Sequence, residues 1–289
     1  MHLAIRGDIP SDYMKRQKTS PSVDSNPLSS GVSHETYVER SEDWNLTDLQ
    51  VLLGSGGIGT NERKETYRSL VNSHFSGCQC VVFVPFASYD HAEYTSRMEE
   101  FIGEGGTRLV GIGSFGDNRE ALQQADGIYV GGGNSFLLVS ELHKQGIMDL
   151  VRKRVLEGMP YLGVSAGANV ACPSMMTTND MPITMVPSFE TLGLVPFQIN
   201  PHYYPGGLWF RESEEGDLSK HYGESRARRI SEFHEMSDYP VIGMYEGSYL
   251  RSEGDFFQLI GNKAVLIRKG SDLTTVEPGA ILTRELTTT

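Results

Sequence analysis

The chain has 289 residues, a formal net charge of −12, 38% hydrophobic residues and 21% charged residues. These values are typical of a globular protein and exclude collagen, a coiled coil and a wholly disordered chain. Nucleic acid and anionic membranes are held by clustered Lys and Arg, which an acidic chain lacks, so we expect neither partner. The three cysteines are too few and too irregularly spaced for a disulfide framework or a zinc site.

The first residues show no basic-then-apolar leader pattern, and no apolar run approaches the roughly 18 residues of a membrane span. We therefore expect a cytoplasmic protein. Residues 1–44 are rich in Ser, Pro, Asp and Lys and have no sustained apolar period. This composition predicts a flexible N-terminal extension, with a partner-binding tail as the alternative, followed by one folded domain at residues 45–289.

Short apolar runs alternate with amphipathic segments from residue 49 onward. Strands are predicted at 49–53, 81–86, 109–112, 127–130, 161–164 and 195–199, and helices at 62–73, 91–103, 119–125, 135–145 and 147–157. This alternation predicts an α/β fold with a largely parallel sheet that is flanked by helices. Close-spaced strands at 249–251, 256–260, 263–267 and 281–286 predict a C-terminal antiparallel addition to the same sheet, or a flanking ribbon.

The first glycine cluster, Gly54-Ser-Gly-Gly-Ile-Gly59, follows a predicted strand and precedes a predicted helix, as in dinucleotide-binding folds. In those folds the second strand ends in a carboxylate that binds the ribose. Here that strand ends Val84-Pro-Phe-Ala-Ser88, with no acidic residue before Asp90. A tight strand-to-helix turn is therefore favoured, and a nucleotide-binding module without hydrolytic chemistry is the alternative.

A second cluster, Gly131-Gly-Gly-Asn134, also ends a predicted strand and begins a predicted helix. Its glycines would let main-chain N–H groups reach an open crevice and donate to a developing oxyanion. A helix-entry turn capped by Asn134 explains the same residues equally well.

The sharpest local signal is Gly163-Val-Ser-Ala-Gly167, which fits the G-x-S-x-G nucleophile elbow. An apolar strand leads into Ser165 on a tight turn, and small residues open the helix that follows. Small neighbours are required because the turn is strained and backbones crowd around the exposed hydroxyl. We therefore predict that Ser165 is a nucleophile.

A serine nucleophile needs a base, and the base needs an orienting acid. Of the eight histidines, His202 follows the predicted strand 195–199, which places it at the sheet edge where α/β proteins build their sites. His221 is a weaker candidate. For the acid, Glu246 ends an apolar strand, whereas Asp180 lies in a polar loop soon after the elbow helix. Glu246 gives the chain order Ser, His, acid, and Asp180 gives the order of α/β hydrolases.

Seven short motifs, taken in order, resemble the aspartyl dipeptidase (peptidase E) family of serine peptidases, which is related to cyanophycinase. They are Gly131–Phe136, Gly163–Asn169, Ala171–Pro173, Thr177–Ile183, Leu194–His202, Gly223–Arg226 and Glu246–Gly247. The resemblance runs from about residue 49 to about residue 269. It implies a glutamine-amidotransferase-like sandwich as the catalytic domain, at residues 45–289. The implied activity is hydrolysis of small peptides with an N-terminal Asp, without a cofactor or metal.

Position by position, the resemblance implies Ser165 as the nucleophile and His202 as the base. The N–H groups of Gly133 and Ala166 would be the oxyanion donors.

The family's acid has been assigned to the positions that match Asp180 and Glu246. We favour Glu246 because it ends a strand, and we keep Asp180 as a site residue. Arg226 matches the position that binds the substrate's carboxylate, and Asn134 is a second candidate for substrate binding. Helix geometry puts Arg226 and Arg229 on one face, so the period alone does not separate them.

Two departures from the family leave the specificity open. The family's first strand leads into a Ser-Asn-Ser turn, whereas this chain has Gly54-Ser-Gly-Gly, and residues 203–216 form an unusual acidic insert. A β-aspartyl or cyanophycin-like peptidase of the same family is therefore the alternative enzyme. Oligomeric state is not readable from the sequence, and a homodimer is one open alternative.

Overall fold

The computed structural model describes residues 48–283 except 104–106, 207–208, 212, 214–215, 221–224 and 255. The predicted N-terminal extension, residues 1–44, and the weaker base candidate His221 lie outside the described residues.

The largest sheet has eight strands in the order β14-β11-β10-β1-β5-β4-β2-β3. Its parallel strands are β1 (Val51–Gly54), β5 (Tyr161–Val164), β4 (Gly127–Val130), β2 (Val81–Val84) and β3 (Leu109–Gly111). Its antiparallel strands are β10 (Ser248–Glu253), β11 (Phe256–Gly261) and β14 (Ile281–Thr283), which extend the sheet from β1. The predicted α/β fold, with a largely parallel sheet and a C-terminal antiparallel addition, is confirmed.

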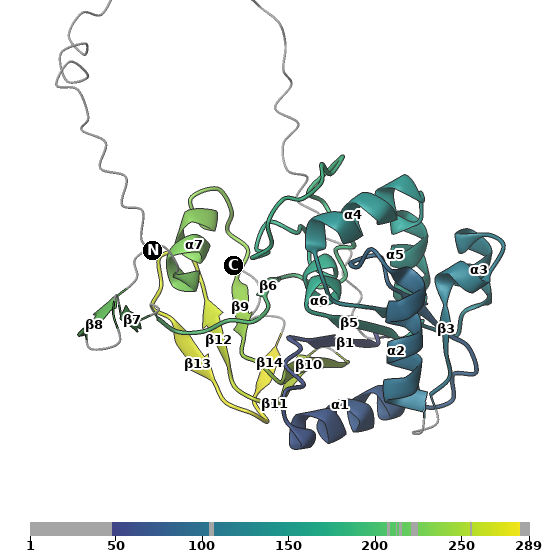
Figure 1. Ribbon diagram of the computed structural model, residues 1–289, viewed down its shortest axis with the longest axis horizontal. Helices are drawn as coiled ribbons and strands as arrows, with labels where there is room; N and C mark the ends of the chain where they lie inside the picture. Colours follow the sequence, from purple (N-terminus) through teal and green to yellow (C-terminus); the bar gives the residue numbers. More distant parts are fainter. Residues whose placement is uncertain are drawn as a thin grey trace, which may run out of the picture. The chain divides into compact units, whose positions relative to one another are not determined.

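Helices cover both faces of this sheet (Figure 1). One face carries α1 (Asn61–His74) and α2 (His91–Gly103). The other face carries α3 (Asn118–Gln124), α4 (Ser135–Lys144), α5 (Met148–Leu156) and α6 (Ala166–Val170). Neighbouring residues of a strand pack on opposite faces: Leu52 contacts the first group and Leu53 the second. Both are fully buried, which is why these strands read as continuous apolar runs. None of the described helices is long and apolar enough to span a membrane.

A second sheet, in the order β13-β12-β9-β6, holds the later part of the chain. Its strands are β6 (Gln198–Asn200), β9 (Val241–Met244), β12 (Ala264–Ile267) and β13 (Thr274–Val276). We expected residues 195–199 to join the main sheet, and this was wrong. The strand begins at Gln198 and pairs in parallel with β9 instead. Val195 and Phe197, which precede this strand, are fully buried. An apolar run in the sequence indicates that a segment is buried, but it does not indicate which sheet the segment joins.

Helix α7 (Arg226–Phe233) packs on this second sheet through Ile230, which shares a buried cluster with Val241 and Val265. The sequence did not predict the antiparallel hairpin of β7 (Trp209–Arg211) and β8 (Leu218–Lys220), whose first strand lies inside the acidic insert. Trp209 and Leu218 are exposed there. With few buried apolar positions, the hairpin leaves little periodic signal in the sequence.

Candidate active site

Ser165 lies on the turn between β5 and α6, with backbone angles φ 53° and ψ −110°. Non-glycine residues rarely adopt this conformation. The flanking glycines are required by close packing: a Cβ on Gly163 would overlap the Gly167 carbonyl, and a Cβ on Gly167 would overlap the Val130 carbonyl. The motif thus has the strand, strained turn and helix that a nucleophile elbow needs.

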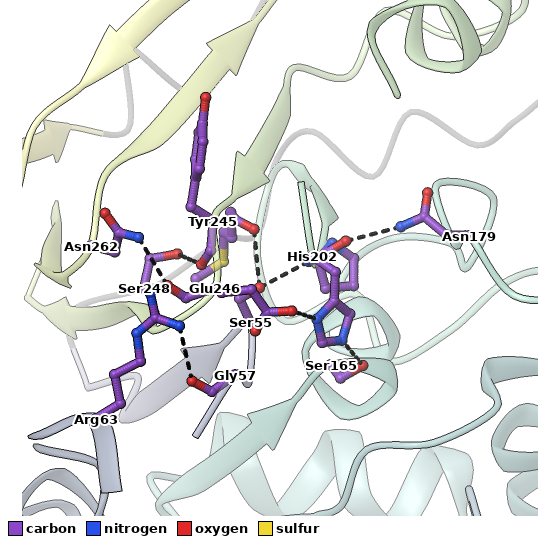
Figure 2. Close-up of polar contacts among 12 residues, drawn as sticks. Ser55, Gly57, Arg63, Ser165, Asn179, His202, Tyr245, Glu246, Ser248 and Asn262 are labelled. Carbon is purple, nitrogen blue, oxygen red and sulfur yellow. Dashed lines mark hydrogen bonds and ion pairs between the residues drawn. The ribbon is translucent and has the colours of Figure 1, made fainter. Parts of the chain in front are cut away.

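His202 follows β6 and lies between a hydroxyl and a carboxylate (Figure 2). Its Nε2 is 2.8 Å from Ser165 Oγ, and its Nδ1 is 2.7 Å from Oε1 of Glu246, which follows β9. The side chains of His202 and Glu246 are 40% and 44% exposed. A substrate can therefore reach these hydrogen-bonded side chains from solvent. The structure thus brings together three of the predicted residues, in the chain order Ser, His, acid.

Asp180, the rival acid, lies elsewhere. Its Oδ2 accepts hydrogen bonds from the backbone N–H and the hydroxyl of Ser135, both at 2.7 Å, at the start of α4. A carboxylate is stabilised there by the unpaired N–H groups and the dipole of the helix. The structure therefore pairs Glu246 with the imidazole of His202, while Asp180 holds its loop against α4.

The glycine loop after β4 lies directly beside Ser165. A Cβ on Gly132 would be 3.0 Å from the Ser165 Cβ, and Gly133 has a φ of 138°. Ala166 is the first residue of α6, so its N–H has no acceptor within the helix. These placements put Gly132 and Ala166 beside Ser165. That the N–H groups of Gly133 and Ala166 form an oxyanion hole stays a prediction.

Two polar side chains fix the glycine loop. Asn134 caps α4 by accepting from Leu137 N–H at 3.1 Å, and its Nδ2 donates to Met181 O at 3.0 Å. The helix-entry role weighed for Asn134 is thus what the structure describes, and substrate binding stays a prediction. The Tyr94 ring and its hydroxyl lie against Gly131. Burial raises the pKa of Tyr94, so this phenol remains neutral.

The first glycine cluster makes room for His202 and Glu246. Gly56 has a φ of 95°, and a Cβ there would be 3.3 Å from His202 Cε1. Gly57 has a φ of 80°, and a Cβ there would overlap the Glu246 carboxylate. The positive φ values and the close approach both require glycine. The cluster is therefore accounted for by a tight turn that belongs to the site.

Tyr249 lies on β10 close to this turn, with its ring against Gly54. Burial raises the pKa of Tyr249 to about 12, while Arg63 opposes the shift and Glu246 adds to it. The phenol therefore stays protonated at neutral pH and does not compete with His202 as a base.

Arg226 is the first residue of α7, and its guanidinium lies over the Tyr204 ring, 5.3 Å from the centroid. Its Nε is buried and has no hydrogen-bond partner among the described residues. Arg229, three residues later, is exposed. The structure thus separates the two arginines that the helical period left equivalent. Gly223 and Glu224, the first two residues of the Gly223–Arg226 motif, lie outside the described residues.

Three residues beside His202 and Glu246 were not predicted from the sequence. Ser55 and Asn179 each form a hydrogen bond with the peptide group between Pro201 and His202. The third is Asn262, whose Nδ2 donates to Glu246 O at 3.0 Å. Ser55 and Asn179 lie inside quoted motifs, but their partners are more than 20 residues away in sequence. Within the part of the chain that the structure describes, no group of His, Cys, Asp and Glu side chains could hold a metal ion.

A serine on a strained elbow, hydrogen-bonded to a histidine that is bonded to a carboxylate, is the arrangement of serine hydrolases. The sequence model of Peptidase family S51 matches residues 50–260. The chain belongs to this peptidase family, which confirms the family and the class of enzyme predicted from the sequence.

Two relatives and one solved structure support the assignment. Peptidase E of Streptomyces coelicolor is 48% identical over 192 residues, which cover 66% of this chain and 75% of that protein. The probable alpha-aspartyl dipeptidase of Drosophila melanogaster is 41% identical over 205 residues, covering 70% and 82%. The crystal structure of a peptidase from an acI-B1 Actinobacterium has a TM-score of 0.55 at 18% identity, covering 81% of this chain and 96% of that one; this likeness concerns the fold.

Proposed function

We propose that this member of family S51 is a serine exopeptidase that hydrolyses dipeptides with an N-terminal Asp. Ser165 is the nucleophile, His202 the base and Glu246 the orienting acid. The observation that carries the proposal is the unbroken hydrogen-bonded line from Ser165 through His202 to Glu246. The names of the two relatives, peptidase E and alpha-aspartyl dipeptidase, support the substrate class.

The geometry supports the following mechanism. His202 Nε2 takes the proton of Ser165 as its Oγ attacks the peptide carbonyl, and the N–H groups of Gly133 and Ala166 donate to the oxyanion. His202 then protonates the leaving amine, the C–N bond breaks, and the aspartyl group remains as an ester on Ser165. Water, deprotonated by His202, hydrolyses this ester. Glu246 holds the imidazole in the required tautomer and stabilises the imidazolium.

Substrate selection is assigned to Arg226, whose guanidinium would pair with the side-chain carboxylate of the N-terminal Asp. Its buried Nε lacks a partner among the described residues, and a buried donor is stabilised when a ligand supplies the missing acceptor. Asp180 and Asn134 contribute by tying residues 180–181 to the start of α4, which follows Gly133, and direct substrate contact by Asn134 stays a prediction.

The function is tested by incubating the purified chain with Asp-Leu, its β-linked isomer and Glu-Leu and comparing initial rates. We expect Asp-Leu to be cleaved fastest. Faster cleavage of the β-linked isomer would establish the alternative enzyme, a β-aspartyl or cyanophycin-like peptidase. Saturable binding of NAD without fluorophosphonate labelling of Ser165 would instead identify a nucleotide-binding module and overturn the proposal.

The two acids should give different kinetic defects. Glu246→Gln should mainly lower kcat, because the amide stabilises the imidazolium less and favours the wrong tautomer. Asp180→Asn should act more on KM, because Asp180 shapes the loop beside α4 and does not touch His202. Steady-state kinetics on Asp-Leu separate the two effects. The reverse pattern would transfer the orienting role to Asp180.

The catalytic domain is proposed to comprise residues 45–289, of which the family match covers 50–260. The cytoplasmic location and a homodimer also stay predictions. Analytical ultracentrifugation of the purified chain measures the oligomeric state directly.

A further inference from the structure

The backbone of His202 is held in a conformation that L residues rarely adopt. Among the described residues, only His202 and Ser165 combine a side chain with a positive φ, and the value at His202 is 55°. Such a conformation persists only where the surroundings hold it in place. The strain at Ser165 is explained by the elbow motif, whereas the sequence around His202 contains no such motif.

Both polar atoms of the peptide group between Pro201 and His202 are hydrogen-bonded to side chains from distant segments (Figure 2). On one side the His202 N–H donates to Ser55 Oγ at 2.9 Å. On the other side Asn179 Nδ2 donates to Pro201 O at 2.9 Å. The plane of this peptide group is therefore fixed from two directions.

The Ser55 hydroxyl is itself fixed. Ser55 is fully buried, and its O–H donates to Met244 O at 3.0 Å. Because a hydroxyl has one proton, its lone pairs remain to accept from the His202 N–H. Met244 ends β9, two residues before Glu246. Ser55 thus ties the base to the strand that presents the acid.

Asn179 is fixed in the same way. Its Oδ1 accepts a hydrogen bond from Asn200 Nδ2 at 2.9 Å, and this contact sets which end of the amide faces Pro201 O. Asn200 ends β6, two residues before His202. The amide of Asn179 therefore bridges both ends of the short segment that carries the base.

We propose that Ser55 and Asn179 are positioning residues that clamp the Pro201–His202 peptide group and so keep the imidazole between Ser165 and Glu246. This inference rests on the proposed function of His202 as the base. Both hydrogen bonds of the imidazole depend on where the main chain places its Cα. A displacement of about 1 Å at a catalytic group can lower turnover about 10²-fold, so the clamp matters for the rate and not for substrate binding.

The test uses Ser55→Ala, which removes the acceptor for His202 N–H, and Asn179→Asp, which replaces the donor to Pro201 O by a carboxylate oxygen and keeps the acceptor for Asn200. Each variant should lower kcat on Asp-Leu roughly 10- to 100-fold with little change in KM. The rate of fluorophosphonate labelling of Ser165 should fall by a similar factor. Ser55→Thr, which retains the hydroxyl, should restore most of both rates.

Ser252→Ala is the matched control, because Ser252 makes the same two contacts away from the site. Its Oγ accepts from Val51 N–H at 2.8 Å and donates to Leu49 O at 2.6 Å, at the start of β1. This variant should lower Tm about as much as Ser55→Ala does and leave kcat unchanged. An equal loss of kcat in the control would mean that the effect is general destabilisation, and would overturn the clamp.

Normal turnover in folded Ser55→Ala and Asn179→Asp would also overturn it. If one variant does not fold, as circular dichroism would show, the other decides. Labelling requires an activated serine but no particular peptide. If the parent protein is labelled but does not cleave Asp-Leu, the substrate proposal fails while the labelling rates still test the clamp. If Ser165 of the parent is not labelled at all, the proposed function fails and the clamp's role falls with it.

Discussion

Replacing Ser165 or His202 by Ala should lower kcat on Asp-Leu by roughly 10³-fold or more. In the proposed mechanism, the nucleophile loses its proton through the 2.8 Å contact between Ser165 Oγ and His202 Nε2. Without the hydroxyl no acyl-enzyme forms. Without the imidazole the hydroxyl stays protonated, and the leaving amine finds no acid.

The double variant, with both Ser165 and His202 replaced by Ala, should be no slower than the slower of the two single variants. Residues that act as a unit make one joint contribution to the rate, and either single replacement already removes it. Steady-state rates at saturating Asp-Leu measure this directly, with Ser252→Ala and His91→Ala as controls outside the line of hydrogen bonds. Mass spectrometry of fluorophosphonate-treated protein adds a second readout, since only a chain that retains Ser165 should gain the label there. Near-normal turnover in either single variant would end this mechanism.

The strands and helices from residue 49 to residue 164 could be predicted because their apolar residues follow clear patterns and because tight turns connect them. Strands that are buried on both faces read as apolar runs, and the five helices between them carry amphipathic periods. Which strand a given strand pairs with could not be predicted in the same way. The strands predicted at 195–199 and 263–267 form as β6 and β12 and belong to the second sheet. Nothing in the composition of these segments distinguishes them from strands of the first sheet.

The site shows the same division between local and long-range information. Ser165 could be predicted because the elbow is one continuous motif whose glycines are fixed by local crowding. His202 and Glu246 could be predicted as residues that follow strands, but their contact joins positions 44 residues apart. The bond from His202 N–H to Ser55 spans 147 residues. It could not be read from a Ser between two glycines, which is equally typical of a simple turn.

The proposed function raises the question of how a chain of net charge −12 would select a substrate with an acidic side chain. Long-range attraction has the wrong sign, so selection has to come from a local cation in a partly dehydrated place. Arg226 meets this requirement. Its guanidinium lies over the Tyr204 ring, which restricts its orientation, and a planar guanidinium matches a carboxylate through two parallel hydrogen bonds.

Arg226→Met should therefore reduce kcat/KM on Asp-Leu by about 30- to 1,000-fold, which corresponds to roughly 2 to 4 kcal/mol for losing one partner of a desolvated charge pair. Arg226→Lys should be nearly as harmful, because an ammonium cannot form the two parallel bonds. Arg229→Met is the matched control. It removes the same charge from the same helix at an exposed position and should have a mild effect.

The comparison of Asp-Leu with Asn-Leu shows whether the loss concerns the carboxylate itself. The amide is nearly the same shape but carries no charge, so its poor cleavage should hardly change in Arg226→Met. The ratio of kcat/KM on Asp-Leu to kcat/KM on Asn-Leu should then fall sharply, because only the charged substrate loses its partner Arg226. General damage to the site would lower both values together and leave the ratio intact. If Arg226→Met cleaves Asp-Leu as well as the parent does, the specificity assignment is wrong, while the roles of Ser165 and His202 are unaffected.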